Sequence, residues 1–470
     1  MEKESMEKIE YLTEPARKTP VLYGDVFVAG AGTAGCLAAI AAARAGAKVI
    51  LVERTPVPGG TLGNGGIGIS SYFSASKDPA RAKRIVGGLA YELEQRLEEA
   101  GGATGFVPVP KDANDSSWRT VGDHEIYKGV ISEMLLEAGV RVFLQTMFCG
   151  AQMDGERIRA VFIENKSGRF AVVAKQFVDA TGDGDIARMA GAERKQIWQR
   201  YHEVCGGPNG LVFGMAGIDF ERFLKENPNG VVDLGGKKTE HPGVIHRRFA
   251  FTHMRDSKYA PFRDLDINFF TSMQSIHEGE MTYINNSKGP ECNVCDAEEL
   301  SRAEMESRIL AMKFANAMRA CVPGCENSYL SWAATQMGVR ASWITVCDHM
   351  MTQEEISAAT RFEDEIGLYG FHDLVGKRPE CAIAEPGFYG MPFRMLLAKG
   401  IDNLFMAGRC VTSDLEAHMS TRNTVGCMIM GQGAGTAAAL CAKEDCTSRG
   451  LSYARLRDEL LRQRVILDAE

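Results

Sequence analysis

The chain has 470 residues, of which 45% are hydrophobic and 24% charged, so it is not disordered and is too long for one small core. Its formal net charge of −8 argues against a nucleic-acid partner, because phosphate binding needs clustered Lys and Arg. We therefore expect a small-molecule partner and no nucleic acid.

The first ten residues mix both charge signs and lack the apolar segment of a secretory signal. The apolar run at Val26–Ala29 then predicts a buried strand, which leads into the glycine turn Gly30–Gly35 and an Ala-rich helix ending near Ala45. A second apolar strand, Lys48–Val52, ends on Glu53. This order predicts a βαβ crossover unit.

The glycine turn has the GxGxxG pattern of dinucleotide sites, and an acidic residue stands 18 positions beyond its last glycine. Gly30 would permit the turn, Gly32 would let the backbone approach a pyrophosphate, and Gly35 would let helix and strand pack closely. Glu53 would accept hydrogen bonds from the ribose hydroxyls. The alternative is an ordinary βαβ turn that binds nothing.

The segment after Glu53 favours FAD over NAD. Arg54 precedes a glycine-dense loop, Pro58–Gly66, that would lie flat against a large cofactor. No second GxGxxG follows a strand elsewhere, so we do not expect a separate NAD(P)H domain.

Two amphipathic helices are expected within residues 84–100 and 124–138, and residues 140–178 show strand-like alternation with hairpin turns at Asp154-Gly155 and Ser167-Gly168. His124 lies at the start of the second helix, and we expect it to face solvent.

Residues 192–395 contain long polar connections, dispersed aromatics and an amphipathic helix near Ala303–Arg319, which predicts a substrate domain inserted into the nucleotide domain. A short apolar strand returns at Asn403–Gly408, followed by a loop and a helix of small residues from Gly426. The stretch 426–442 is broken by glycines and falls short of the ~20 apolar residues of a membrane span, so we expect none.

Three separate motifs carry a family resemblance: VDATGDGDIARMAGA at 178–192, NLFMAGRC at 403–410 and MGQGAGTAAA at 430–439. They resemble the FAD-dependent oxidoreductase family with the ATGDGD signature, within the glutathione-reductase-like flavoprotein superfamily. Further likeness at 211–219, 322–324, 338–340 and 389–394 extends the resemblance over about residues 20–440.

The resemblance implies an α/β fold, with a Rossmann-like FAD-binding domain (three-layer, with a mostly parallel sheet and a small β-meander) and an inserted α+β substrate domain. The expected boundaries are 20–191 and 396–445 for the FAD-binding domain, 192–395 for the insertion and 446–470 for a helical tail. We expect the following residues to contact FAD: Gly30, Gly32, Thr33, Ala34, Gly35, Glu53, Arg54, Gly60, Thr61, Asn64, Gly65, Gly66, Ala180, Thr181, Gly182, Gly408, Arg409, Gly426 and Gly431.

Two positions depart from the family pattern. Many relatives in the superfamily have Gly-Asp where this chain has Gly408-Arg409, and an Arg there would approach phosphate or substrate anions. A second Arg is expected shortly after Arg340, but Ser342 and Trp343 stand there, which puts the family's substrate preference in doubt.

Hydride uptake makes the flavin N1–C2 edge negative, so a positive potential is needed there, and the N-terminus of the helix near Gly426 would supply it. The same small residues would also allow tight helix packing. In the preceding loop, His418 is the candidate acid/base, since imidazole exchanges protons near neutral pH; the alternative is a hydrogen-bonded surface histidine. Arg422 and Arg409 would hold a substrate carboxylate, or pair with Glu416 and Asp414.

Arg340, Tyr389 and Arg394 are further candidates for substrate binding, with structural roles as their alternative. The pairs Cys292/Cys295 and Cys321/Cys325 have a spacing compatible with a four-cysteine metal site, but the helix between them would hold the pairs ~20 Å or more apart, so we expect no metal. The 13 cysteines indicate reduced thiols and a cytoplasmic location.

The predicted function is hydride transfer between FAD and a small organic substrate, with an electron donor or acceptor that the sequence does not identify. One alternative is an electron-transfer flavoprotein, with a metal at the four cysteines. A flavin-dependent hydroxylase is a further alternative, which the Gly408-Arg409 departure disfavours.

Overall fold

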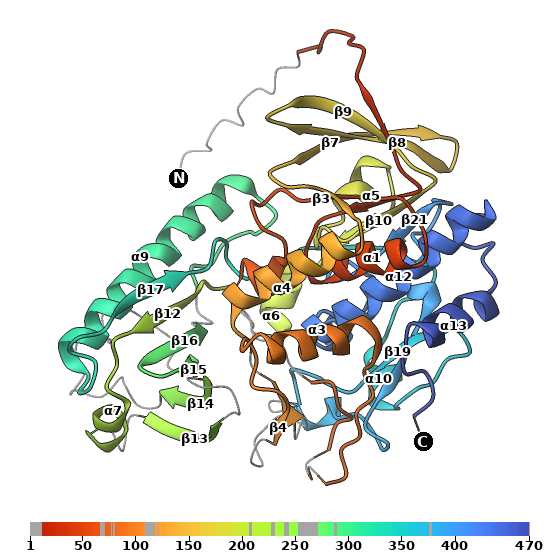
Figure 1. Ribbon diagram of the computed structural model, residues 1–470. Coiled ribbons are helices and arrows are strands. Elements are labelled where there is room, and N and C mark those ends of the chain that lie inside the picture. The colour runs from red at the N-terminus through yellow and green to blue at the C-terminus, as the bar shows by residue number, and fades with distance from the viewer. Residues whose placement is uncertain are drawn as a thin grey trace.

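The computed structural model describes residues 12–65, 71–76, 78, 80–108, 118–120, 122–205, 209–226, 231–238, 244–251, 271–285, 289–375 and 378–469 (Figure 1). Its centre is a five-stranded sheet in the order β21-β10-β2-β3-β6, and every neighbouring pair in it is parallel. These strands are β2 (Val26–Ala29), β3 (Val49–Val52), β6 (Arg141–Phe143), β10 (Gln176–Asp179) and β21 (Leu404–Met406).

The central strands are short and almost entirely apolar because both faces of the sheet are covered. On one face lies the four-stranded sheet β1-β9-β8-β7, and on the other lies a layer of helices (Figure 1). The small sheet consists of β1 (Val21–Tyr23), β7 (Met147–Asp154), β8 (Arg157–Asn165) and β9 (Gly168–Val173). The expected α/β fold, with a three-layer nucleotide domain and a small β-meander, is confirmed.

The helical layer is built around α1 (Thr33–Arg44) and α12 (Thr424–Glu444), which pack backbone against backbone. A Cβ at Gly431 would lie 2.1 Å from the carbonyl oxygen of Ala34, and one at Gly435 would lie 2.0 Å from that of Ala38. Small residues are therefore required along this face. Further helices of the layer are α3 (Gly88–Glu99), α4 (His124–Glu137) and α13 (Tyr453–Arg462).

Among the described residues, α12 is the one helix that is long and apolar enough to cross a membrane. By length and composition, the expectation that this stretch is too short for a span is therefore wrong. Every residue of its apolar window is buried inside the protein. Its apolar character is explained by its place in the core.

A second assembly of antiparallel strands and helices has a hydrophobic core of its own. Its six-stranded sheet has the order β13-β14-β15-β16-β12-β17, and the long helix α9 (Ala297–Cys321) lies beside β17 at the edge of the molecule (Figure 1). Phe213 and Phe314 meet in its core with ring centroids 5.3 Å apart. The strands are β12 (Val212–Ala216), β13 (Val231–Lys238), β14 (Val244–Phe251), β15 (Thr271–His277), β16 (Glu280–Asn285) and β17 (Tyr329–Ala333), with α7 (Phe220–Glu226) nearby.

Within the expected insertion 192–395, the segments behave differently. Apolar residues between 211 and 339 form the second core, whereas most of those between 347 and 398 pack into the main core with α12. Leu374, Val375 and Cys381 instead join a small third cluster with Tyr201, Ala341 and Met419. The remaining elements are α2 (Gly60–Gly63), β4 (Val107–Pro108), β5 (Trp118–Arg119), α5 (Asp185–Met189), β11 (Arg194–Gln196), α6 (Trp198–Cys205), β18 (Trp343–Thr345), α10 (Gln353–Ser357), β19 (Glu365–Tyr369), η2 (Pro379–Cys381), β20 (Tyr389–Pro392), η3 (Phe393–Leu396) and α11 (Leu415–Thr421).

Candidate functional site

The glycine turn joins β2 to α1, and its three glycines are required for different reasons. Gly30 has a φ of +85°, and a Cβ there would lie 2.8 Å from the carbonyl oxygen of Ala180. A Cβ at Gly35 would lie 1.7 Å from the Gly30 carbonyl oxygen. At Gly32, by contrast, the nearest atoms to an added Cβ are the Ala180 oxygen and the Gly60 Cα, both at 3.9 Å. The fold therefore requires glycine at positions 30 and 35 but leaves room for a Cβ at Gly32.

A second glycine segment forms the other wall of this space. Gly59 donates its N–H to the Ala31 carbonyl at 2.7 Å, and a Cβ at Gly60 would lie 2.6 Å from the Cα of Gly32. A short cradle without side chains results at the N-terminus of α1, where backbone N–H groups favour an anion. Thr33 and Ala34 continue this turn as the first residues of α1.

The loop after Gly60 is anchored to the second assembly. Thr335 donates its backbone N–H to the Asn64 carbonyl at 2.9 Å and its hydroxyl to Asn64 Oδ1 at 2.9 Å. A Cβ at Gly65 would lie 2.8 Å from the carbonyl oxygen of Thr61, so this glycine is required by the local turn. Gly66 lies outside the described residues.

Glu53, at the end of β3, lies beside this cradle and is only 7% exposed. Its Oε2 accepts the Ala31 N–H at 2.7 Å, and its Oε1 accepts the Thr55 N–H at 2.8 Å. Because each carboxylate oxygen accepts more than one hydrogen bond, these contacts leave capacity for two ribose hydroxyls. Arg54 follows Glu53 and is exposed.

Asp179, at the end of β10, is the first acidic residue of the DATGDGD segment, and its hydrogen bonds give it a structural role. It is fully buried; its Oδ1 accepts the backbone N–H and hydroxyl of Thr181, at 3.1 and 2.7 Å, and its Oδ2 accepts the Ala187 N–H at 2.9 Å. These bonds hold the turn of Gly182, whose φ is +81°. The sequence argument did not single out Asp179, although a carboxylate between a buried strand and a glycine turn is a signal for such capping.

Arg409 is held by the protein itself. Its Nη2 pairs with Asp183 at 2.7 Å, its Nε donates to the Gly182 carbonyl at 3.0 Å, and its Nη1 donates to the Val339 carbonyl. Burial opposes ionisation of Asp183, but the charge of Arg409 and the hydroxyl of Ser342 outweigh it and lower the pKa of this carboxyl. The sequence argument paired Arg409 with an external anion or with Glu416 and Asp414; the structure pairs it with Asp183.

Gly408 connects this clamp with the helical layer. Its φ is +89°, and an added Cβ would meet the Ala34 Cβ at 3.2 Å and the Cys427 Sγ at 4.0 Å. The glycine turn, the end of β21 and the start of α12 therefore lie next to one another.

The N-terminus of α12 has no side-chain cap. Asn423, at the cap position, instead donates its amide to the carbonyls of Met419 and Ser420, at 2.8 and 3.2 Å. A Cβ at Gly426 would lie 2.9 Å from the Thr421 carbonyl oxygen, so tight packing is one reason for this glycine. Gly431 packs against α1, which explains this glycine by packing, and its contact with a cofactor stays a prediction.

His418 belongs to the helix α11 and not to a loop, and it is 1% exposed. Its Nε2 lies 3.2 Å from the Arg340 carbonyl oxygen, so this nitrogen carries the proton and donates, and its Nδ1 lies 3.5 Å from the Ser413 hydroxyl. Burial, with the charges of Arg422 and Arg409, lowers the pKa of His418 to about 3. This value lies far below the neutral range expected for a proton carrier.

Arg422 lies at the end of α11, where its Nη2 donates to Asp373 at 2.7 Å and its guanidinium stands 5.9 Å from the Tyr201 ring centre. Its Nε is buried and has no hydrogen-bond partner among the described residues. The expected pairing with Glu416 or Asp414 is wrong, because Glu416 pairs with Arg378 at 3.3 Å and Asp414 caps α11.

The three further substrate candidates lie in different places. The Arg340 backbone adjoins His418, and the fully buried Tyr389 shares a hydrogen bond with Ser420 at 2.8 Å. Arg394 is 53% exposed and pairs with Asp364 at 3.0 Å. The structure thus brings two of the three to α11 and leaves Arg394 at the surface.

Two other expectations concern His124 and a metal site. His124 is 6% exposed and packs against Trp332 with ring centroids 3.6 Å apart, so the expectation that it faces solvent is wrong. In the described part of the chain, no three His, Cys, Asp or Glu side chains lie close enough together to hold a metal ion.

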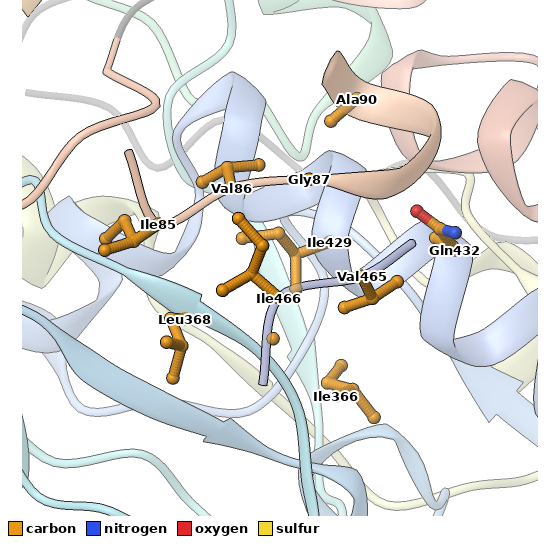
Figure 2. Close-up of a pocket in the computed structure, with 11 residues that line it drawn as sticks. Ile85, Val86, Gly87, Ala90, Ile366, Leu368, Ile429, Gln432, Val465 and Ile466 are labelled. Carbon is orange, nitrogen blue, oxygen red and sulfur yellow. The ribbon is translucent and has the colours of Figure 1, made fainter. Parts of the chain in front are cut away.

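A separate apolar pocket lies between the start of α3, β19, α12 and the C-terminal segment (Figure 2). Aliphatic side chains, including Ile366, Ile429 and Ile466, line it, and Gln432 stands at its edge and accepts the Leu89 N–H at 2.9 Å. None of its lining residues belongs to the glycine turn or to the DATGDGD segment, so we do not assign it to the cofactor site.

Comparison with known proteins identifies one family. The family model described as FAD dependent oxidoreductase matches residues 25–460. No curated protein sequence matches the chain significantly.

Several solved structures are similar. A geranylgeranyl bacteriochlorophyll reductase-like protein from Thermoplasma acidophilum has 13% identity and a TM-score of 0.43, over 95% of this chain and 85% of that chain. A p-nitrophenol 4-monooxygenase from Pseudomonas putida has 11% identity and a TM-score of 0.44, over 94% and 84%. A myxobacterial chondrochloren halogenase has 11% identity and a TM-score of 0.45, over 94% and 79%. All three TM-scores are below one half, so no property of these proteins is transferred to this chain.

Proposed function

Because the chain belongs to the FAD dependent oxidoreductase family, we propose that it transfers a hydride between the flavin N5 and a small anionic organic substrate. The enzyme uses FAD as its cofactor. The observation that carries the proposal is a row of glycines whose backbone is not covered by side chains of their own. The row extends from the N-terminus of α1 past Gly60 and Gly408 to the start of α12.

Three parts of the chain support this placement of FAD. We place the ribose at Glu53, where the carboxylate retains acceptor capacity, and the pyrophosphate in the open space before Gly32, beside Gly60. We place the flavin between Gly408 and the start of α12. FAD, when bound there, supplies the group that takes up or gives a hydride.

The uncapped N-terminus of α12 and the buried Arg422 support a site for negative charge. Both are positive, and Asp373 neutralises Arg422 through one nitrogen while its Nε is left unpartnered among the described residues. Such groups stabilise charge that develops at a buried flavin edge or on a bound carboxylate. We therefore propose that Arg422 binds the anionic part of the substrate.

His418 takes a positioning role in this proposal. With its pKa lowered to about 3, the ring is neutral at pH 7 and keeps its Nε2–H on the Arg340 carbonyl. It thereby fixes α11, and with it Arg422, against the Arg340 segment. This replaces the acid/base role expected from the sequence.

The test begins with FAD reconstitution and anaerobic reduction of the bound flavin, followed by a screen of carboxylated and uncharged compounds for reoxidation. Arg422→Met should keep the flavin spectrum and raise KM for carboxylated substrates, while His418→Asn should lower turnover by less than the roughly 10²–10⁴-fold expected for loss of an acid/base. The exposed Arg394→Met is the matched control, with no expected effect.

Two results would contradict the proposal. Reoxidation by uncharged compounds alone would refute the anionic substrate. Oxygen consumption coupled to substrate hydroxylation would replace hydride transfer with hydroxylase chemistry.

A further inference from the structure

Helix α9 has a second apolar face that is exposed in the described part of the chain. Its inner face, which includes Ala303, Phe314 and Met318, packs into the second core. On the outside, Met305, Ile309 and Met312 are 61%, 48% and 50% exposed. A surface helix normally presents polar residues to solvent, so three neighbouring large apolar side chains need a separate explanation.

The exposed residues form a seam with coiled-coil spacing. Steps of four and three residues alternate along it, which places its members on one stripe of the helix. The seam residues are Glu298, Arg302, Met305, Ile309, Met312, Asn316 and Arg319. Apolar residues occupy the middle of the seam, and charged residues stand toward both ends.

The two ends of the seam carry opposite charges. Glu298 lies eleven positions before Ile309, and Arg319 lies ten positions after it, about 16 and 15 Å away at 1.5 Å per residue. Glu304 and Glu306 flank the first half, where they pair with Arg308 and Arg302, and Lys313 flanks the second. An antiparallel helix of the same sequence therefore matches acidic ends with basic ends on both sides.

We propose that α9 is the interface of a homodimer, in which the seams of two copies pack antiparallel about a twofold axis near Ile309. A closed twofold contact uses the same patch on both chains, and this seam is self-complementary in that way. The helix lies along one edge of the molecule, where a second copy can approach (Figure 1). A single helix pair buries less than the about 1,200 Å² of a standard interface, so the dimer should dissociate at roughly micromolar concentrations.

Sedimentation equilibrium of the FAD-loaded enzyme tests this proposal. At high concentration the parent should approach twice its chain mass of 51.3 kDa. Ile309→Glu should yield a monomer, because two carboxylates would meet at the axis. Leu136→Glu, at a residue on α4 that is 75% exposed, is the matched control and should leave the dimer intact.

The pairing direction is tested by charge reversal. Glu298→Arg and Arg319→Glu should each raise the dimer dissociation constant several-fold, and the double variant should restore the parent value. A parent that stays monomeric, an Ile309→Glu variant that dimerises like the parent, or a Leu136→Glu variant that loses the dimer would each overturn the proposal. Failure of the double variant to restore association would overturn the antiparallel pairing.

Discussion

Replacing Gly32 by alanine should weaken FAD binding while leaving the fold of the cofactor-free chain intact. The added Cβ would lie 3.9 Å from both the Ala180 carbonyl oxygen and the Gly60 Cα, which is ordinary contact. The φ of Gly32, −74°, is readily adopted by alanine. The methyl group would instead occupy the space in which we place the pyrophosphate.

The size of the effect follows from the bonds that the methyl group displaces. A hydrogen bond to a charged group contributes about 1.5–3 kcal/mol, and about 1.4 kcal/mol changes a dissociation constant tenfold. Loss of one phosphate bond to the α1 N-terminus should therefore raise the Kd of FAD about 10- to 100-fold, and loss of two should multiply these factors.

Two other glycines supply the comparison. Gly35→Ala would place its Cβ 1.7 Å from the Gly30 carbonyl oxygen, so it should disturb folding itself. Gly129→Ala, in α4, has nothing within 4 Å of its Cβ and should leave FAD binding unchanged, while alanine's higher helix propensity raises stability by about 0.5–1 kcal/mol. Titration of the cofactor-free proteins with FAD, together with thermal unfolding, measures both quantities. A Gly32→Ala variant that binds FAD like the parent would refute our placement of the pyrophosphate.

Three further predictions concern charged groups. Glu53→Gln should weaken FAD binding and loosen the glycine turn, because one amide nitrogen would face the N–H of Ala31 or Thr55; FAD titration and hydrogen exchange measure these effects. Burial raises the pKa of Glu94 from 4.5 to about 8, so the native state keeps a proton that the unfolded state releases, and the free energy of unfolding should fall as pH rises between these values. Glu94→Gln should remove that decrease in urea unfolding at pH 5 and 8. Arg409→Met should lower the free energy of unfolding by about 1.5–3 kcal/mol, with partial recovery on adding Asp183→Asn; full stability in the single variant would show that the clamp contributes nothing.

The nucleotide-binding half of the fold could be predicted because local patterns determine it. The apolar runs at Val26–Ala29 and Val49–Val52 became neighbouring parallel strands, and the glycine turn lies between them as expected. The turn signals at Asp154-Gly155 and Ser167-Gly168 also located the hairpins that join β7 to β8 and β8 to β9. The FAD-dependent oxidoreductase family, to which the three motifs pointed, is confirmed by a family model that matches residues 25–460.

The partners of the charged residues could not be predicted, because they come from segments far apart in the sequence. Arg409 meets Asp183, and Arg422 meets Asp373, and in neither case does spacing along the chain indicate the pair. The burial of His418 was missed for the same reason. The sequence predicted a loop there, whereas the Asp414 side chain accepts the backbone N–H of Ala417, three residues on, and so caps the start of a helix. The local sequence pattern therefore predicts helices and strands, whereas tertiary packing determines the burial and the partners of their polar side chains.

The close packing of α12 on α1 also bears on how the enzyme is made. During synthesis α1 leaves the ribosome about 390 residues before α12, which at 5–20 residues per second is a delay of about 20–80 s. Throughout that time Ala34 and Ala38 lack the glycines of α12 against which they pack, and the place that we propose for the flavin lacks one of its walls. On the placement of FAD that we propose, the complete cofactor site forms only after α12 has left the ribosome and packed on α1.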